Sequence, residues 1–273
     1  MAAMEHVDVV IIGGGASGLA AAAELGMSSA ELCVLVIEKN DEPARKLRAT
    51  GSGRCNITNT SATGYNEIMK FFRRIGLVTR AYENGLVYPY SESAADVAEL
   101  LTARVRELGV RIITGAEVTA VSRATSAPHA SSATYGGFIV RYETRTRDAR
   151  EVAADHVILA TGGKAGPMYG TTGDGYRLAR ELGHSIVTPI PVLTSVECKE
   201  WDQGTEPWGM ELAGTRTRGI VTLIRNSDNT ESSSTVTRAV RKELLREAGE
   251  IQFTKYGLSG VCVFKMTRFM RYD

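Results

Sequence analysis

The clearest hydrophobic pattern lies at residues 7–12, V-D-V-V-I-I, a run of mainly β-branched side chains that ends at glycines. Such a run predicts a buried strand of a parallel sheet. A second run, C-V-L-V-I, occupies residues 33–37, and the alanine-rich segment 19–25 between the two predicts a helix. Together these segments predict a strand–helix–strand unit and therefore an α/β fold.

The same pattern analysis extends along the first two thirds of the chain. Further buried strands are predicted at residues 110–114 and 156–160, and helices at 65–77 and 176–182. Ser93 and Asp96 form a capping box that begins another helix, which Gly109 ends. Segments 117–121, 137–144 and 151–153 predict a small antiparallel meander, with a Ser- and Ala-rich loop at 122–133.

The pattern changes after Pro189 and Pro191. Short strands are predicted at residues 193–198, 220–225 and 250–253, with a polar segment that contains Trp201 and Trp208 and a polar hairpin tip at 226–237. We therefore expect an α/β domain at residues 1–191, a β-rich insert domain at 192–260, and a short remaining piece at 261–273.

The glycines after the first strand carry the first chemical signal. Gly13, Gly15 and Gly18 give the spacing G-x-G-x-x-G, which allows a tight turn, close approach of a pyrophosphate, and close packing of helix on strand. Glu38 follows the second strand, twenty residues after Gly18, where a carboxylate accepts hydrogen bonds from a ribose diol. Because it lies at a strand end, we expect Glu38 to contribute little to folding.

Two further segments point to the same ligand. Residues 45–59 place three cationic side chains beside a Gly-Ser-Gly turn, which suits a phosphate, although a solvated basic loop explains the same residues. The predicted strand 156–160 ends in Thr161-Gly162-Gly163. Since ligands of parallel sheets bind at the carboxyl ends of strands, this end is expected beside the first glycine loop.

Composition excludes several classes of function. A formal net charge of +1 gives no electrostatic reason to expect nucleic acid or an anionic membrane as a partner. The four cysteines and four histidines show no metal-ligand spacing and no C-x-x-C pair, which favours a reducing compartment. We expect a cytoplasmic protein without a membrane segment; the sequence does not indicate its oligomeric state.

These motifs together resemble a bacterial family of NAD(P)/FAD-dependent oxidoreductases, the aminoacetone-oxidase-like flavoproteins. The block T-G-S-G-R-C-N-I-T-N at residues 50–59 is the most diagnostic part, and G-L-V-Y-P-Y-S, T-G-D-G-Y and G-E-I-Q-F-T-K-Y-G-L-S-G follow in the family's order. The resemblance implies that residues 1–191 form a Rossmann-like FAD-binding domain with FAD as cofactor, and it also allows NAD(P)H as a transient electron donor. It further leads us to expect that this chain lacks the family's usual C-terminal segment.

The resemblance assigns cofactor contacts by position. The implied set is Gly13, Gly15, Ala16, Ser17 and Gly18 at the pyrophosphate; Glu38 and Lys39 at the ribose; Lys46, Thr50, Gly51, Gly53, Arg54, Cys55 and Asn56 toward the flavin; Val118 at adenine; and Ala160, Thr161, Gly162 and Gly163 along the dinucleotide.

The expected activity is hydride transfer between FAD and a small organic substrate. Arg54, Tyr90 and Cys55 are candidates for acid–base work, but the residues assign none of them, and each has a structural alternative: an anchor, a core aromatic and a small buried side chain. A catalytically impaired flavin-binding remnant is the alternative function. A simple NAD-binding dehydrogenase is disfavoured by the loop at 45–59.

Overall fold

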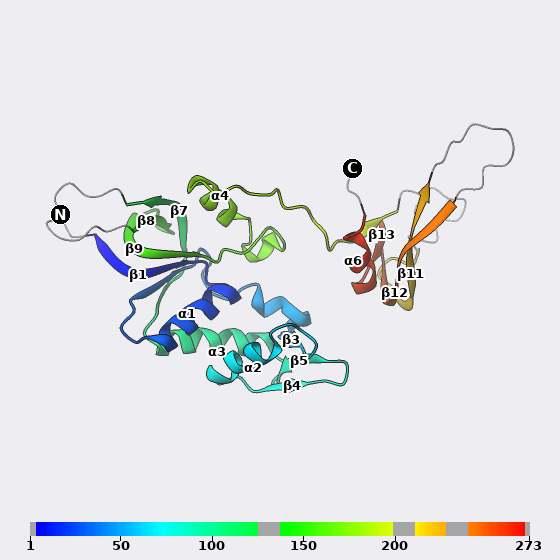
Figure 1. Ribbon diagram of the computed structural model, residues 1–273, viewed down its shortest axis with the longest axis horizontal. Helices are drawn as coiled ribbons and strands as arrows, with labels where there is room; N and C mark the ends of the chain where they lie inside the picture. Colours follow the sequence, from blue (N-terminus) through cyan, green and yellow to red (C-terminus); the bar gives the residue numbers. More distant parts are fainter. Residues whose placement is uncertain (1–3, 125–136, 199–210, 228–239, 271–273) are drawn as a thin grey trace. The chain divides into compact units, whose positions relative to one another are not determined.

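The structure is a computed structural model that describes residues 4–124, 137–198, 211–227 and 240–270. It divides into two compact units, Met1–Thr188 and Pro189–Asp273 (Figure 1). The division comes three residues before the boundary expected from the two prolines, and it groups residues 261–273 with the second unit. Each unit is described by itself below.

The first unit is built on a six-stranded sheet with the strand order β6-β2-β1-β9-β8-β7. Strand β1 (Glu5–Ile12) lies at its centre and pairs in parallel with β2 (Val34–Ile37) and with β9 (Ala149–Leu159). Strand β6 (Arg111–Ile113) extends the parallel part beside β2. The four buried strands predicted from apolar runs are therefore confirmed as one parallel sheet.

The antiparallel meander continues this sheet and does not form a separate one. Strands β7 (Ala116–Arg123) and β8 (Phe138–Thr144) pair with each other, and β8 pairs with the first half of β9. The prediction of separate strands at 151–153 and 156–160 is wrong: both belong to β9. The strand is continuous because residues 152–154 pair with β8 on one side and with β1 on the other, which holds the backbone extended through this region.

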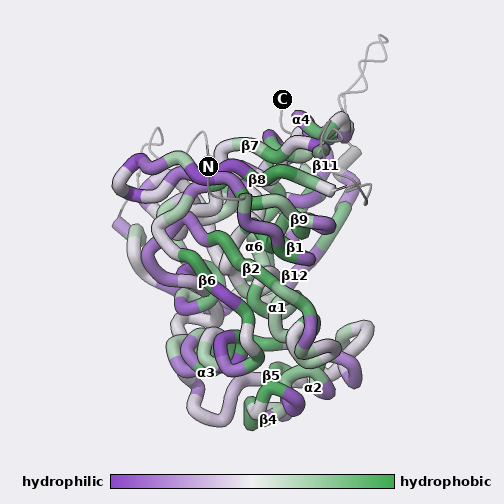
Figure 2. The backbone as a smooth tube through the Cα atoms, turned by 90° about the vertical axis from the view of Figure 1, so that its left-hand side faces the viewer, coloured by the Kyte–Doolittle hydropathy of each residue, from purple (hydrophilic) through white to green (hydrophobic). Residues whose placement is uncertain are grey.

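Helices cover one face of the parallel strands, and side chains of the meander and of a further helix pack against their other face (Figure 1). Helices α1 (Ala16–Ser28) and α3 (Ala94–Glu107) pack on Val9, Ile11 and their neighbours in β2. The alternate residues of β1, including Val10 and Ile12, pack with residues of β7, β8 and helix α4 (Asp174–Glu181). Strand β2 is buried on both faces, and Figure 2 shows it as hydrophobic throughout.

Smaller elements follow the second strand. A 3₁₀ segment η1 (Leu47–Gly53) precedes the three-stranded sheet β3-β5-β4, which comprises β3 (Thr58–Asn59), β4 (Thr79–Ala81) and β5 (Leu86–Pro89). Helix α2 (Tyr65–Arg74) lies between β3 and β4 in the chain, where a helix was predicted. A second 3₁₀ turn, η2 (Pro167–Tyr169), precedes α4.

The second unit is a four-stranded antiparallel sheet in the order β10-β13-β12-β11, with helix α6 (Val261–Thr267) packed on it. Its strands are β10 (Val196–Glu197), β11 (Arg216–Ser227), β12 (Val240–Thr254) and β13 (Gly257–Ser259). The expectation of a β-rich unit is confirmed, but β11 and β12 are much longer than predicted. Trp201, Trp208 and most of the predicted loops 122–133 and 226–237 lie outside the described residues.

None of the helices in the described ranges combines the length and apolar composition needed to span a membrane. Within those same ranges, no group of three or more His, Cys, Asp or Glu side chains is placed to hold a metal ion. All four cysteines are free thiols, of which Cys33 is exposed and Cys55 and Cys262 are buried.

The cap of α3 gives a test of this fold. Ser93 Oγ accepts a hydrogen bond from the backbone N–H of Asp96, and α3 places Val97, Leu101 and Val105 in the core. We predict that Ser93→Ala lowers the free energy of unfolding by about 1 kcal/mol, because it removes this acceptor. Urea unfolding measures the change. Ser93→Thr, which keeps the hydroxyl that accepts from the Asp96 N–H and donates to the Asp96 carboxylate, should remain close to wild type; an equal loss in both variants would contradict the assignment.

Candidate functional site

The carboxyl ends of β1, β2 and β9 meet at one edge of the sheet and surround a cavity of about 370 Å³. This volume lies within the usual range for small-molecule sites, roughly 300–1,000 Å³. Its lining comes from the glycine loop and from four later segments of the chain: Ile12, Gly13, Gly15, Ala16, Ser17, Ile37, Glu38, Lys39, Asn40, Ala44, Arg45, Lys46, Leu47, Thr50, Ala116, Val118, Ala160, Thr161, Gly162, Tyr169, Gly170, Thr171, Asp174 and Leu178.

The three motif glycines have the distinct surroundings that the sequence predicted. A Cβ on Gly13, whose φ is +106°, would lie 2.5 Å from the carbonyl oxygen of Ala160, and a Cβ on Gly18 would lie 1.9 Å from the carbonyl oxygen of Gly13. These two glycines allow backbone segments to touch. A Cβ on Gly15 would meet no atom within 4 Å, because that position faces the cavity. Open space at Gly15 fits close approach of a ligand.

The start of helix α1 supplies hydrogen-bond donors at the same place. Gly15 is the N-cap, and its carbonyl accepts the first intrahelical bond from Leu19 N–H at 2.9 Å. The amides of Ala16, Ser17 and Gly18 precede that bond and have no acceptor within the helix. The first turn contains no acidic side chain. With the positive end of the helix dipole, this terminus is suited to a phosphate group.

Glu38 is a buried carboxylate at the cavity wall, with 6% of its surface exposed. Its Oε2 accepts a hydrogen bond from the backbone N–H of Gly14 at 2.6 Å, and its Oε1 accepts two from Asn40, the backbone N–H at 2.8 Å and Nδ2 at 2.6 Å. These hydrogen bonds argue against the expectation that Glu38 matters little for folding. The carboxylate satisfies buried donors of the glycine loop as well as lining the site.

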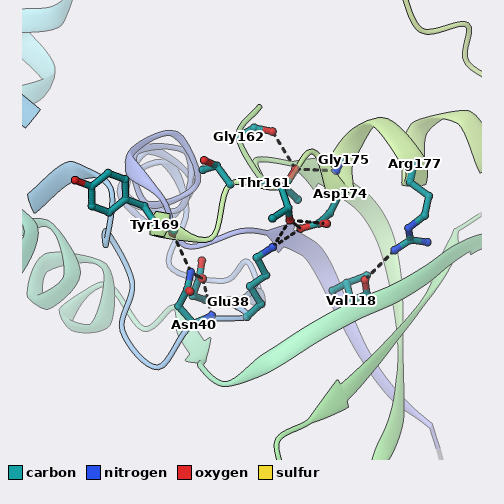
Figure 3. A network of polar contacts seen from close by, with 12 residues as sticks. Glu38, Asn40, Val118, Thr161, Gly162, Tyr169, Asp174, Gly175 and Arg177 are labelled. Carbon is teal, nitrogen blue, oxygen red and sulfur yellow. Dashed lines mark hydrogen bonds and ion pairs between the residues drawn. The ribbon is translucent and has the colours of Figure 1, made fainter. Parts of the chain in front are cut away.

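A polar network joins the end of β2 to the start of α4 (Figure 3). Lys39 Nζ donates to Thr172 Oγ1 at 2.7 Å and forms an ion pair with Asp174 at 2.5 Å, with both side chains about a quarter exposed. Thr161 Oγ1, after β9, accepts from the Gly175 N–H at 2.9 Å. Lys39 thus lines the cavity but is held by α4, whose first turn it anchors.

Val118 lies on β7 opposite the glycine loop, is buried, and lines the cavity. A β-bulge separates Val118 from Ala120 in the pairing with β8. Arg177 of α4 donates to the carbonyl of Thr119 at 2.8 Å and, over a longer 3.5 Å, to that of Val118 (Figure 3). The backbone here therefore departs from a regular ladder.

The structure divides the residues predicted at the flavin side into two groups. Lys46 and Thr50 line the cavity, and Lys46 Nζ donates to the carbonyl of Ala165 at 2.8 Å. The remaining members lie outside its lining: Gly51, Gly53, Arg54, Cys55 and Asn56. Among the other predicted contacts, Ala160, Thr161 and Gly162 line the cavity, whereas Gly163 and Gly18 do not.

The candidates for acid–base work lie beyond the cavity wall. The guanidinium of Arg54 lies over the Tyr88 ring at 4.9 Å and 3.8 Å from Glu92. Cys55 is 4% exposed and belongs to the hydrophobic core cluster. Tyr90 is 66% exposed, so its interpretation as core packing is wrong. None of these three side chains lines the cavity among the described residues.

Several lining residues were not assigned as cofactor contacts from the sequence, and those with polar side chains are Asn40, Arg45, Tyr169, Thr171 and Asp174. Asp174 belongs to the T-G-D-G stretch at the start of α4, so its position had a sequence signal. Arg45 was counted only as part of a cationic loop. Asn40 and Tyr169 had no signal, because the loops around them are brought together by the fold.

Comparison of the sequence with known protein families shows that the chain belongs to one of them. The chain matches the HI0933-like protein Rossmann domain over residues 7–66 and 61–258. These ranges contain every segment that lines the cavity.

Curated relatives cover much of the chain. A 3-dehydro-bile acid delta(4,6)-reductase of Clostridium scindens is 34% identical over 277 residues, which cover 94% of this chain and 59% of the relative. A ribosomal RNA dihydrouridine synthase of Haemophilus influenzae is 24% identical over 217 residues, 73% of this chain and 51% of the relative. The chain thus spans between half and three fifths of these relatives. Among solved structures, THI4 of Thermovibrio ammonificans superposes with a TM-score of 0.49 at 18% identity, covering 70% of this chain and 67% of that one.

Burial gives the thiols different reactivities. Burial raises the pKa of the Cys55 thiol, and a hydrogen bond with Thr50 offsets this only in part. Since the thiolate is the reactive form, Cys55 stays protonated and slow at pH 7–8. We predict that a thiol reagent labels the exposed Cys33 well before Cys55 in the folded protein, and both at similar rates in urea. Mass spectrometry of the labelled peptides measures the order; fast labelling of Cys55 would contradict its core position.

The burial of Glu38 predicts a cost in stability. We expect Glu38→Ala to lower the free energy of unfolding by about 1–3 kcal/mol, because three donors lose their acceptor. The control is Glu42→Ala, which removes a mostly exposed carboxylate nearby and should change stability by less than about 0.5 kcal/mol. Urea unfolding compares the two. Equal stability of Glu38→Ala and wild type would show that the carboxylate has no structural role.

Proposed function

Because the chain belongs to the HI0933-like family of Rossmann-domain proteins, we propose that it is a flavin-dependent oxidoreductase that binds FAD. The observation that carries this proposal is the cavity at the carboxyl ends of β1, β2 and β9. A helix N-terminus, an open glycine position and a buried carboxylate face one space there, and each suits a different part of a dinucleotide.

The cofactor contacts follow from the chemistry of the lining residues. The free amides of Ala16 and Ser17 would hold the pyrophosphate, with Gly15 leaving room for it. Glu38 would accept a hydrogen bond from the adenosine ribose, and Val118 would contact adenine. Lys46 and Thr50 would lie toward the flavin.

Bound FAD would supply hydride acceptance and donation, whereas the chain's own residues bind and orient it. The network of Lys39, Asp174 and Thr172 would fix α4 against the end of β2 and thereby hold the cavity walls in place. Thr161 would fix the other wall through its bond to the Gly175 amide. No proton donor or acceptor is assigned among the lining residues.

We further propose that the substrate is a small organic molecule and that the reaction runs toward its reduction. The relative of Clostridium scindens is named as a reductase of a bile acid, which favours this direction. NAD(P)H is proposed as a transient donor, since the sequence contains no second G-x-G-x-x-G for a resident nicotinamide. Free thiols at all four cysteines support a cytoplasmic location.

The visible spectrum of the purified protein tests the cofactor. We expect flavin absorbance with FAD, and not FMN, released on denaturation, and bleaching of that absorbance when NADH or NADPH is added without oxygen. Substrate screening then follows the reoxidation of the reduced flavin by unsaturated small molecules. A protein that takes up neither FAD nor ADP when offered them would overturn the proposal.

Two glycine variants separate binding from folding. We predict that Gly15→Val stays within about 1 kcal/mol of wild-type stability, because its Cβ meets no protein atom within 4 Å and only the N-cap preference for glycine is lost. It should lose FAD binding by at least about a hundredfold, since the side chain fills the pyrophosphate position. Gly18→Ala should instead lose folding stability, because its Cβ would lie 1.9 Å from a carbonyl oxygen. Calorimetric titration with FAD and urea unfolding measure the two effects. Normal FAD binding by Gly15→Val would show that the ligand does not approach this glycine.

A further inference from the structure

The side-chain amide of Asn40 is fixed in one orientation beside the cavity. Its Nδ2 donates to Oε1 of Glu38 at 2.6 Å (Figure 3). Its Oδ1 accepts from Nη1 of Arg45 at 3.2 Å. A carboxylate only accepts hydrogen bonds and a guanidinium only donates them. A flipped amide would therefore face two like partners, so these two neighbours determine which end of Asn40 meets Glu38.

The surrounding backbone holds Asn40 in place as well. Its N–H donates to Oε1 of Glu38 at 2.8 Å, and its carbonyl accepts from the Gly115 N–H at 2.8 Å. The loop before α4 closes over the side chain: a Cβ on Gly170 would lie 2.6 Å from Nδ2 of Asn40. Asn40 thus joins the end of β2, the turn before β7 and the loop after β9.

These contacts limit what the Glu38 carboxylate can still bind. An ionised carboxylate offers about four lone-pair positions, two on each oxygen. Asn40 uses both positions on Oε1, and the Gly14 N–H uses one on Oε2. One position on Oε2 remains, and Glu38 lines the cavity.

We propose that Asn40 is a positioning residue that saturates Oε1 of Glu38 and leaves Oε2 as the single acceptor for one ribose hydroxyl of the cofactor. This inference rests on the proposed function, since it concerns the same dinucleotide site. It differs from the expectation drawn from sequence, in which the carboxylate accepts both hydroxyls of the ribose diol. The site therefore distinguishes the 2′ from the 3′ hydroxyl.

Binding of ADP, 2′-deoxy-ADP and 3′-deoxy-ADP to the full chain, measured by calorimetry, tests this inference. In the wild type we expect one deoxy analogue to bind at least about tenfold more weakly than ADP, the scale of one hydrogen bond to a charged group, and the other within about threefold of ADP. Equal losses for the two analogues would overturn the proposal. If neither ADP nor FAD binds to the wild type, the proposed function itself is overturned.

Variants at position 40 test the positioning role. Asn40→Ala frees one position on Oε1 and releases the carboxylate, so the ratio of the two deoxy affinities should fall by at least about threefold. Asn40→Asp keeps the shape but replaces the donor by an acceptor, and it should lower the ratio as well; it also serves if Asn40→Ala folds poorly. Asn84→Ala, which removes an asparagine side chain from the β4–β5 turn, is the control and should leave the ratio unchanged. A wild-type ratio in both Asn40 variants would overturn the positioning role.

Discussion

The site depends on the close contact between the first turn of α1 and the end of β1. Gly18 lies against the carbonyl of Gly13, and Gly13 lies against the carbonyl of Ala160, at distances that leave no room for a Cβ. Because these backbones touch, the N-terminus of α1 lies at the carboxyl ends of β1 and β9. Its amides then face the cavity, and the positive end of the helix dipole faces the position proposed for the pyrophosphate.

Glu38 connects this contact to the rest of the site. Burying an ionised carboxylate is costly unless donors satisfy it. Here the donors come from the glycine loop and from Asn40, so the charge that is proposed to recognise the ribose also stabilises the loop proposed to hold the pyrophosphate. Under the proposed function, folding and ligand recognition therefore share one group.

The loop at 45–59 illustrates why a continuous motif need not form a continuous surface. Gly51, Ser52 and Cys55 adopt left-handed backbone conformations with φ near +60°. These residues reverse the chain, so that Lys46 and Thr50 line the cavity while Cys55 packs into the core cluster. Nothing in the letters T-G-S-G-R-C-N distinguishes the two groups, because the reversal depends on the packing of η1 against α3.

The sequence by itself determined the parallel strands, the helices on them and the glycine loop with Glu38 at a shared edge. These features depend on local hydrophobic periodicity and on the steric requirements at single glycines, and both can be read from residues that are close together in the sequence. Only the tertiary structure decided that segments 151–153 and 156–160 form one strand, and that Asn40 saturates one oxygen of Glu38. The physical reason is that strand pairing, burial and hydrogen-bond saturation depend on partners distant in the chain, such as β8 with β9 and the loop before α4 with Asn40.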